Sequence, residues 1–227
     1  MGERNFGTNA DYEELRELLT AERMGSYFQA SSGDLLGAFA LYEWNMTASA
    51  AIMHTVGMVE VLVRNALDRN LTAWMERKEP GSDWLDLRAL DDRARSDIAD
   101  ARRRASQRNN ASTHGKVIAE LSLGFWRYLV ASRYLTSLWI PAAQGAFPLG
   151  SSDAGMRRSQ VESSLKSLHF VRNRAAHHEP IHRRDLMKDL RTSTEIAGWI
   201  SPTARDWILA RSTLELTVKS RPRPRLN

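Results

Sequence analysis

The chain has 227 residues, a formal net charge of +5 and no cysteine, which excludes disulfides, thiolate zinc sites and a cysteine nucleophile. This length suffices for one sizeable core and no linker divides it, so we expect a single domain over residues 1–219. The apolar runs are shorter than a bilayer span and the N-terminus lacks a signal-peptide core, which predicts a cytoplasmic protein with no membrane partner.

The hydrophobic pattern predicts an all-α protein, because apolar residues recur at spacings of three and four and no alternation is sustained. We expect a first helix over residues 11–24 and a second one capped by Asp34. The periodicity then runs to about Arg77 without a proline. Since that is long for a globular helix, we expect a break near residues 45–47, and a turn at KEPGSDW (78–84).

A strongly basic helix follows over residues 91–109. Nearly all of the positive charge of the chain is arginine, whose planar fork matches phosphate, although a GC-rich genome produces the same bias. The arginines of this helix are therefore candidates for RNA contact, but like charges on a helix are more often a solvated face. They are Arg102, Arg103 and Arg104.

Segment 116–143 is rich in aromatic residues. Their helical spacing among Leu and Val predicts core positions rather than base-stacking ones. A long helix should run from about Asp153 into the segment before Pro180, followed by helical periodicity over residues 183–199. The final helix has Ser201 as N-cap and Pro202 in first position. The alternating arginines and prolines of residues 220–227 (SRPRPRLN) predict a disordered basic tail. The residues of this segment that could otherwise be read as base-stacking are Trp126, Tyr128, Tyr134 and Trp139.

Two chemical patterns overlap in VRNRAAHHEPIH, residues 171–182. The H-E-x-x-H pattern from His178 has the spacing of a zinc hydrolase helix. Pro180 interrupts that helix, so the two imidazoles lose their common face and zinc hydrolysis is only a remote alternative. We expect no metal and no cofactor.

The other pattern, R-N-x-x-x-H, places Arg172, Asn173 and His177 near a helix end. Asn173 and His177 share a face with His169, whereas Arg172 is rotated by about 140° from His177. An imidazole that moves protons and a guanidinium that stabilises a phosphate suffice for RNA cleavage through the 2′-OH without a metal. Arg and His at a helix C-terminus also simply complement its dipole.

The chain resembles the Abi-like (abortive infection) proteins of the HEPN superfamily of helical ribonucleases. The resemblance covers roughly residues 35–185 and rests on LYEWN (41–45), VEVLVRNAL (59–67), ELSLGFW (120–126), YLTSLWIPAAQGAFP (134–148) and SLHFVRNRAAHHEPIH (167–182). HEPN proteins carry an R-x(4–6)-H motif, which Arg172, Asn173 and His177 match. His178 fits the longer spacing equally well, so the working histidine stays open.

The resemblance implies a helical bundle of the HEPN type, here with additional peripheral helices, and a homodimer with two motifs in one cleft. It further implies a metal-independent endoribonuclease that serves as a toxin or phage-defence effector, with an antitoxin or defence protein as a possible partner. Many HEPN proteins are inactive, so a non-catalytic RNA-binding or protein-interaction module is the alternative. Arg174 is a further candidate for RNA contact.

A second Arg-Asn pair, Arg64 and Asn65, lies four residues after Glu60. Glu60 and Arg64 at this spacing predict an ordinary ion pair on a helix. The functional alternative is a carboxylate and a cation that support the catalytic groups from behind, together with His169, because buried charges need partners.

Overall fold

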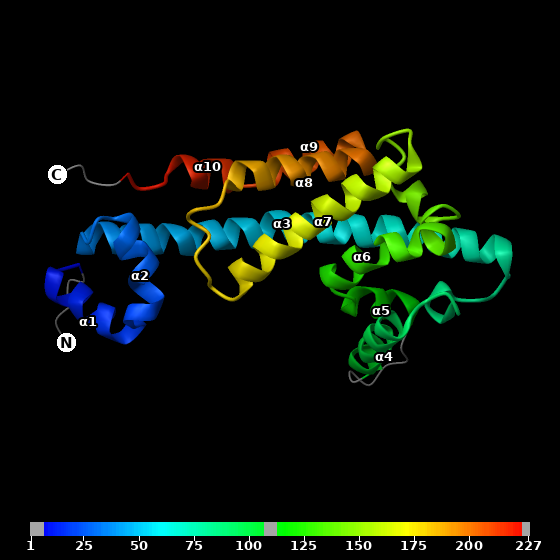
Figure 1. The fold of residues 1–227 in the computed structure, drawn as a ribbon, viewed down its shortest axis with the longest axis horizontal. Coiled ribbons are helices and arrows are strands. Elements are labelled where there is room, and N and C mark those ends of the chain that lie inside the picture. Colours follow the sequence, from blue (N-terminus) through cyan, green and yellow to red (C-terminus); the bar gives the residue numbers. More distant parts are fainter. Residues whose placement is uncertain (1–6, 107–112, 224–227) are drawn as a thin grey trace. The chain divides into compact units, whose positions relative to one another are not determined.

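The structure is a computed structural model that describes residues 7–106 and 113–223. All regular structure in these two stretches is helical (Figure 1), which confirms the predicted all-α class. The more specific assignment to a bundle of the HEPN type stays a prediction.

The chain divides into two compact units, each assembled from separate stretches of sequence. The first unit contains residues 1–54, 171–187 and 212–227, and the second contains residues 55–170 and 188–211. The expectation of a single domain over residues 1–219 stays a prediction.

The N-terminal segment forms two helices, α1 (Asn9–Leu19) and α2 (Ala21–Ala30), so the prediction of one helix over residues 11–24 was wrong. The chain breaks at Thr20, whose φ of 68° is incompatible with a right-handed helix. The break separates a helix without buried residues, α1, from α2, which buries Met24 and Tyr27.

Helix α3 (Leu35–Lys78) runs for 44 residues. The side chain of Asp34 accepts a hydrogen bond from the N–H of Gly37 (3.0 Å), as predicted for an N-cap. The predicted break near residues 45–47 is wrong, because the Asn45 side chain is buried and bonded to a distant segment rather than competing for its own backbone. The helix ends near the predicted residue, and Gly81 (φ 81°) turns the chain.

Part of α3 is long and apolar enough to match a membrane span by composition alone. Half of that stretch is buried inside the protein, and the core helices of soluble proteins pass the same test. The expected absence of a membrane partner therefore stays a prediction.

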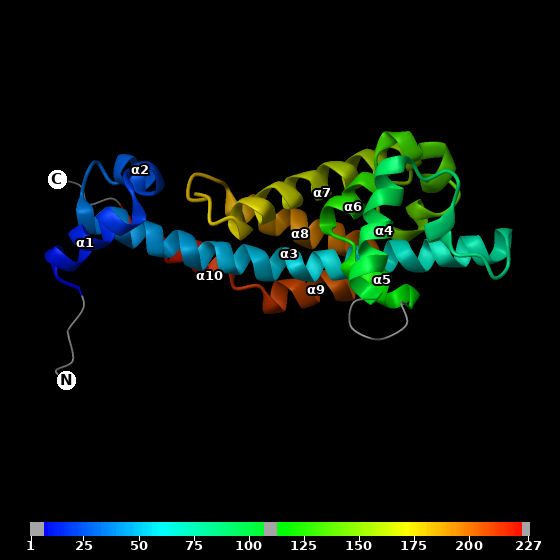
Figure 2. The ribbon, with the colours of Figure 1, turned by 90° about the horizontal axis from the view of Figure 1, so that it is seen from below.

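The second unit continues with a short helical turn, η1 (Trp84–Asp86), and with α4 (Asp92–Ser106), α5 (His114–Glu120) and α6 (Leu123–Leu129). Helix α4 packs against α5 and α6, and the three gather beside the C-terminal half of α3 (Figure 2). Residues 107–109 of the predicted basic helix lie outside the described residues. Short helical segments follow at Ser132–Tyr134, Leu135–Trp139 and Ala143–Ala146.

The structure confirms the predicted core position for three of these four aromatic residues. Trp126, Tyr134 and Trp139 are buried. Tyr128 is half-buried, with the guanidinium carbons of Arg93 and Arg133 at 4.2 and 5.3 Å from its ring centroid.

Four further helices complete the fold: α7 (Ala154–Ala176), α8 (Leu186–Ile200), α9 (Pro202–Arg211) and α10 (Leu214–Lys219). The long helix α7 and the start of α9 at Pro202 confirm the sequence prediction. Helix α9 is not the last one, however, since α10 follows and the indole N–H of Trp44 donates to the Thr217 carbonyl (2.7 Å). In the predicted tail, Arg221 lies over Trp44, and residues 224–227 are outside the described residues.

Candidate functional site

The R-N-x-x-x-H segment lies where α7 ends in a Schellman motif. The N–H of Glu179 donates to the Arg174 carbonyl (2.8 Å), and the N–H of His178 donates to the Ala175 carbonyl (3.2 Å). His178 occupies the left-handed position that usually requires glycine, with φ 55°. Pro180 follows two residues after His178 and prevents any continuation of the helix.

The four proposed catalytic residues lie within this helix end. Arg172 and Asn173 are half-buried in the last turn of α7, whereas His177 and His178 are exposed in the turn after it. Arg172 Nη1 lies 3.4 Å from Asn173 Oδ1. Neither imidazole makes a hydrogen bond or ion pair with any residue that the structure describes, so both can exchange protons with a ligand.

The turn after α7 is fixed by arginines that bind its carbonyl groups. Arg23, on α2, donates to the His178 carbonyl (2.5 Å). Arg174 donates to the Pro180 carbonyl (2.8 Å) and forms an ion pair with Glu179 (3.1 Å). Arg174 was expected to contact RNA, which stays a prediction, but in this structure its guanidinium holds the turn.

The segment after Pro180 is anchored in the core of the first unit. The N–H of Ile181 donates to Asn45 Oδ1 (2.8 Å), and His182 is fully buried beside Tyr27, with Ser26 Oγ 3.3 Å from its Nε2. Burial, reinforced by nearby arginine charges, lowers the pKa of His182 to about 4. A rigid anchor therefore follows the exposed imidazoles directly.

The zinc pattern of this segment does not form the geometry that it requires. His178 lies outside α7 and is exposed, and His182 is buried in the core, so they share no helix face. In the described part of the chain no three His, Asp or Glu side chains gather in a way that could hold a metal ion.

The residues expected to support the site from behind belong to the second unit. A Cβ added to Gly124 would lie 3.1 Å from His169 Nε2, so this imidazole packs on the first turn of α6. Glu60 and Arg64 do not form the ion pair that their spacing predicts; instead Arg64 Nη1 lies 3.4 Å from the Ala119 carbonyl. Their supporting roles stay predictions.

The basic face of α4 is neutralised by carboxylates. The three arginines that the sequence suggested for RNA contact would have to exchange these partners to bind a phosphate. Their contact with RNA stays a prediction. The pairs are Arg102 with Asp86 (2.9 Å), Arg103 with Asp100, and Arg104 with Glu120 (3.1 Å).

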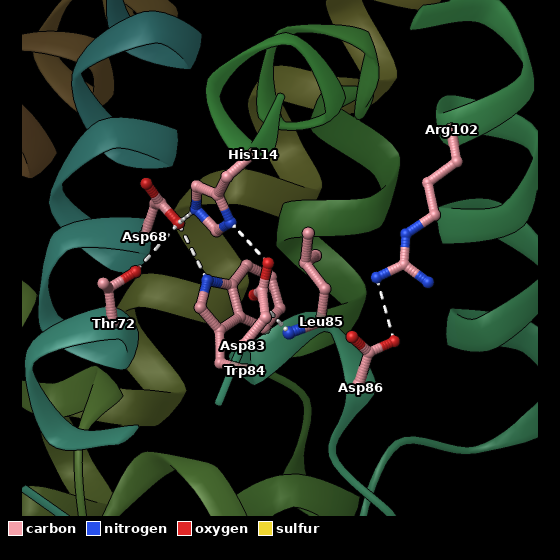
Figure 3. Close-up of polar contacts among 8 residues, drawn as sticks. All are labelled: Asp68, Thr72, Asp83, Trp84, Leu85, Asp86, Arg102 and His114. Carbon is pink, nitrogen blue, oxygen red and sulfur yellow. Dashed lines mark hydrogen bonds and ion pairs between the residues drawn. The ribbon is translucent and has the colours of Figure 1, made fainter. Parts of the chain in front are cut away.

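A polar cluster that the sequence reading missed lies in the second unit, where His114 bridges two carboxylates (Figure 3). Its Nε2 is 2.7 Å from Asp68 and its Nδ1 is 2.8 Å from Asp83, while the Trp84 indole also donates to Asp68 (2.8 Å). Burial alone would lower the pKa of His114, but the bonds to Asp83 and Asp68 raise it above its ordinary value. Spacing could not reveal this cluster, because its members come from α3, the turn before α4, and α5.

The residues that hold the turn after α7 were also missed. Arg23 and Ser26 carry no local pattern, and their partners are more than 150 positions away in the sequence. Asn45 belongs to the LYEWN block, but the sequence suggested no role for it.

No protein-family model matches the chain, and comparisons with curated proteins and with solved structures find no match either. The functional assignment therefore depends on the residues themselves and on the resemblance that they carry.

Proposed function

We propose that the chain is a metal-independent endoribonuclease that cleaves RNA by transesterification at the 2′-OH. The observation that carries the proposal is the helix end with two exposed imidazoles, His177 and His178, which bond to no residue that the structure describes and follow the half-buried Arg172 by five and six positions. The Schellman motif and the carbonyl contact of Arg23 hold this end in one conformation, which favours catalysis over a flexible tail.

The chemistry needs two proton transfers and one stabilised charge. A neutral imidazole accepts the 2′-OH proton as the bond from O2′ to phosphorus forms, and a protonated imidazole donates to O5′ as the bond from phosphorus to O5′ breaks. Arg172 binds the phosphate oxygens that gain charge, and Asn173 orients the phosphate or the imidazole. The products are a 2′,3′-cyclic phosphate and a 5′-hydroxyl.

Base and acid come either from His177 and His178 of one chain or from His177 of two chains. The second arrangement requires a homodimer with both motifs in one cleft, as the resemblance to HEPN proteins implies. In a cell, such an enzyme would act as a toxin or phage-defence effector, which an antitoxin or defence protein could control.

The test is cleavage of RNA by the purified protein in the presence of a chelator. Removing the base or the acid should lower the rate by roughly 100- to 10,000-fold, so Arg172→Ala and His177→Ala should each abolish measurable cleavage. His178→Ala shows which imidazole works. The matched controls are His54→Ala, at an exposed histidine of α3, and Arg205→Ala, at an exposed arginine of α9; both should cleave like the wild type.

Undiminished cleavage in both Arg172→Ala and His177→Ala would remove these residues from the mechanism. RNA binding that survives both substitutions, with no cyclic phosphate ends produced, would favour the non-catalytic binding module. Growth arrest on expression in a bacterial host, lost in His177→Ala, is the expected outcome for a toxin.

A further inference from the structure

The second unit contains a groove with a volume of about 1050 Å³ that is separate from the R-N-x-x-x-H segment. It lies between the C-terminal end of α3, the turn that follows it and residues 136–141. This size suits a small organic ligand or a short piece of a polymer. Its charges and its aromatic side chain decide which one.

Two of the carboxylates that line the groove are bound by basic side chains from outside it. Asp83 is bound by His114 and Asp86 by Arg102, at 2.8 and 2.9 Å (Figure 3). Both carboxylate partners of His114 favour its protonated form. Asp86 thus has its own cation, whereas the single charge of protonated His114 is shared between Asp83 and Asp68.

Two cations of the groove have no carboxylate partner. Lys78 and Arg88 make no ion pair with any residue in stretches 7–106 and 113–223, and both are exposed. Glu79 is the acid that opposes them, also exposed and also unpaired among the described residues. Among the lining charges that have no ion-pair partner in these stretches, two are cations and one is an acid.

An aromatic ring and several hydroxyl groups complete the lining. Trp74 is half-buried, and the ammonium of Lys78 lies 4.9 Å from the centroid of its ring. Ser82, Thr136 and Ser137 add hydroxyl groups that can donate or accept hydrogen bonds. Lys78 already contacts this ring, and Arg88 adds a second cation without a carboxylate partner among the described residues. An aromatic ring beside cations is a combination by which proteins bind single-stranded nucleic acid, with a base on the ring and phosphates at the cations.

We propose that this groove binds a nucleotide segment of single-stranded RNA, with a base against Trp74 and phosphates at Lys78 and Arg88. An acidic peptide would use the cations but has no need of the tryptophan, so the ring separates the two ligands. The proposal goes beyond the ribonuclease assignment and does not depend on it, since the groove binds RNA whether or not the chain cleaves it.

The test is fluorescence anisotropy with a labelled 2′-O-methyl RNA of roughly ten nucleotides. This RNA has no 2′-OH to act as a nucleophile, so a failure of binding leaves the ribonuclease proposal to its own assay. The Lys78→Gln/Arg88→Gln double variant should bind at least 10-fold more weakly. The slope of log K against log salt is negative, and its magnitude should decrease by about 1.4, because two phosphate contacts are lost at about 0.7 each.

Three further variants make the result specific to the groove. Glu79→Gln should bind more tightly than the wild type, since it removes the opposing charge. Trp74→Ala should weaken binding by about 5- to 100-fold, and Trp74→Phe should retain most of it because a ring remains. The control, Arg69→Gln/Lys166→Gln, removes one arginine and one lysine from exposed positions outside the groove and should change the affinity far less.

The proposal is overturned if the groove double variant and the control double variant bind alike, or if Trp74→Phe is as weak as Trp74→Ala. It is also overturned if polyglutamate displaces the RNA at equal charge concentration, since the groove would then be an unspecific cation site. Tight binding of a free mononucleotide without binding of the RNA strand would exclude the strand as the ligand.

Discussion

Replacing His178 with glycine tests how α7 ends and what that ending does. His178 has φ 55° at the Schellman position, where a Cβ clashes with the backbone. Its removal should relieve roughly 1–2 kcal/mol of strain. Glycine gains freedom in the unfolded chain that costs roughly 0.5–1 kcal/mol. The free energy of unfolding should therefore rise by about 0.5–1 kcal/mol.

The gain is measurable by urea denaturation followed by circular dichroism. With an m-value near 2 kcal/mol/M, the midpoint should rise by about 0.2–0.5 M. His178→Ala is the control, because alanine removes the imidazole and keeps the Cβ, so its stability should not rise. If the glycine variant is no more stable than the alanine variant, the left-handed conformation of His178 is wrong. The same pair separates strain from catalysis, since both variants lack the imidazole.

His182 and His114 should shape the pH dependence of stability in opposite directions. The pKa of His182 is lowered to about 4 in the folded state, so the unfolded chain binds more protons as pH falls from 6.5 towards 4. Roughly 3 kcal/mol of stability should be lost there, and His182→Gln should remove this dependence. The pKa of His114 is raised, so its stabilisation is complete below pH 6.5 and is lost as pH rises through the folded-state value. Asp83→Asn should flatten that loss in denaturation curves measured at several pH values, whereas an unchanged loss would contradict the assigned pair.

The sequence predicted what local patterns encode. Helical periodicity gave the all-α class, and the cap at Asp34 and the helix start at Pro202 were predicted correctly because both signals act within one turn. The helix end at residues 176–180 also followed from Pro180 alone.

The errors arose where distant contacts decide the local conformation. Thr20 carries no turn signal, yet it adopts φ 68° and divides the first predicted helix. Asn45 suggested a break, but its side chain bonds to Ile181, so the helix continues. The contact of Arg23 with the His178 carbonyl and the bridge of His114 between two carboxylates join residues that no spacing rule connects.

The first unit combines stretches of sequence that are synthesised at different times, so it can fold only late in translation. Its N-terminal part leaves the ribosome long before residues 171–187, which carry the imidazoles, and α10, which receives the Trp44 indole bond, comes later still. Because domains fold only once their parts have been translated, the unit cannot close on a nascent chain that ends before Thr217. The proposed ribonuclease activity would thus appear only when the polypeptide is almost finished.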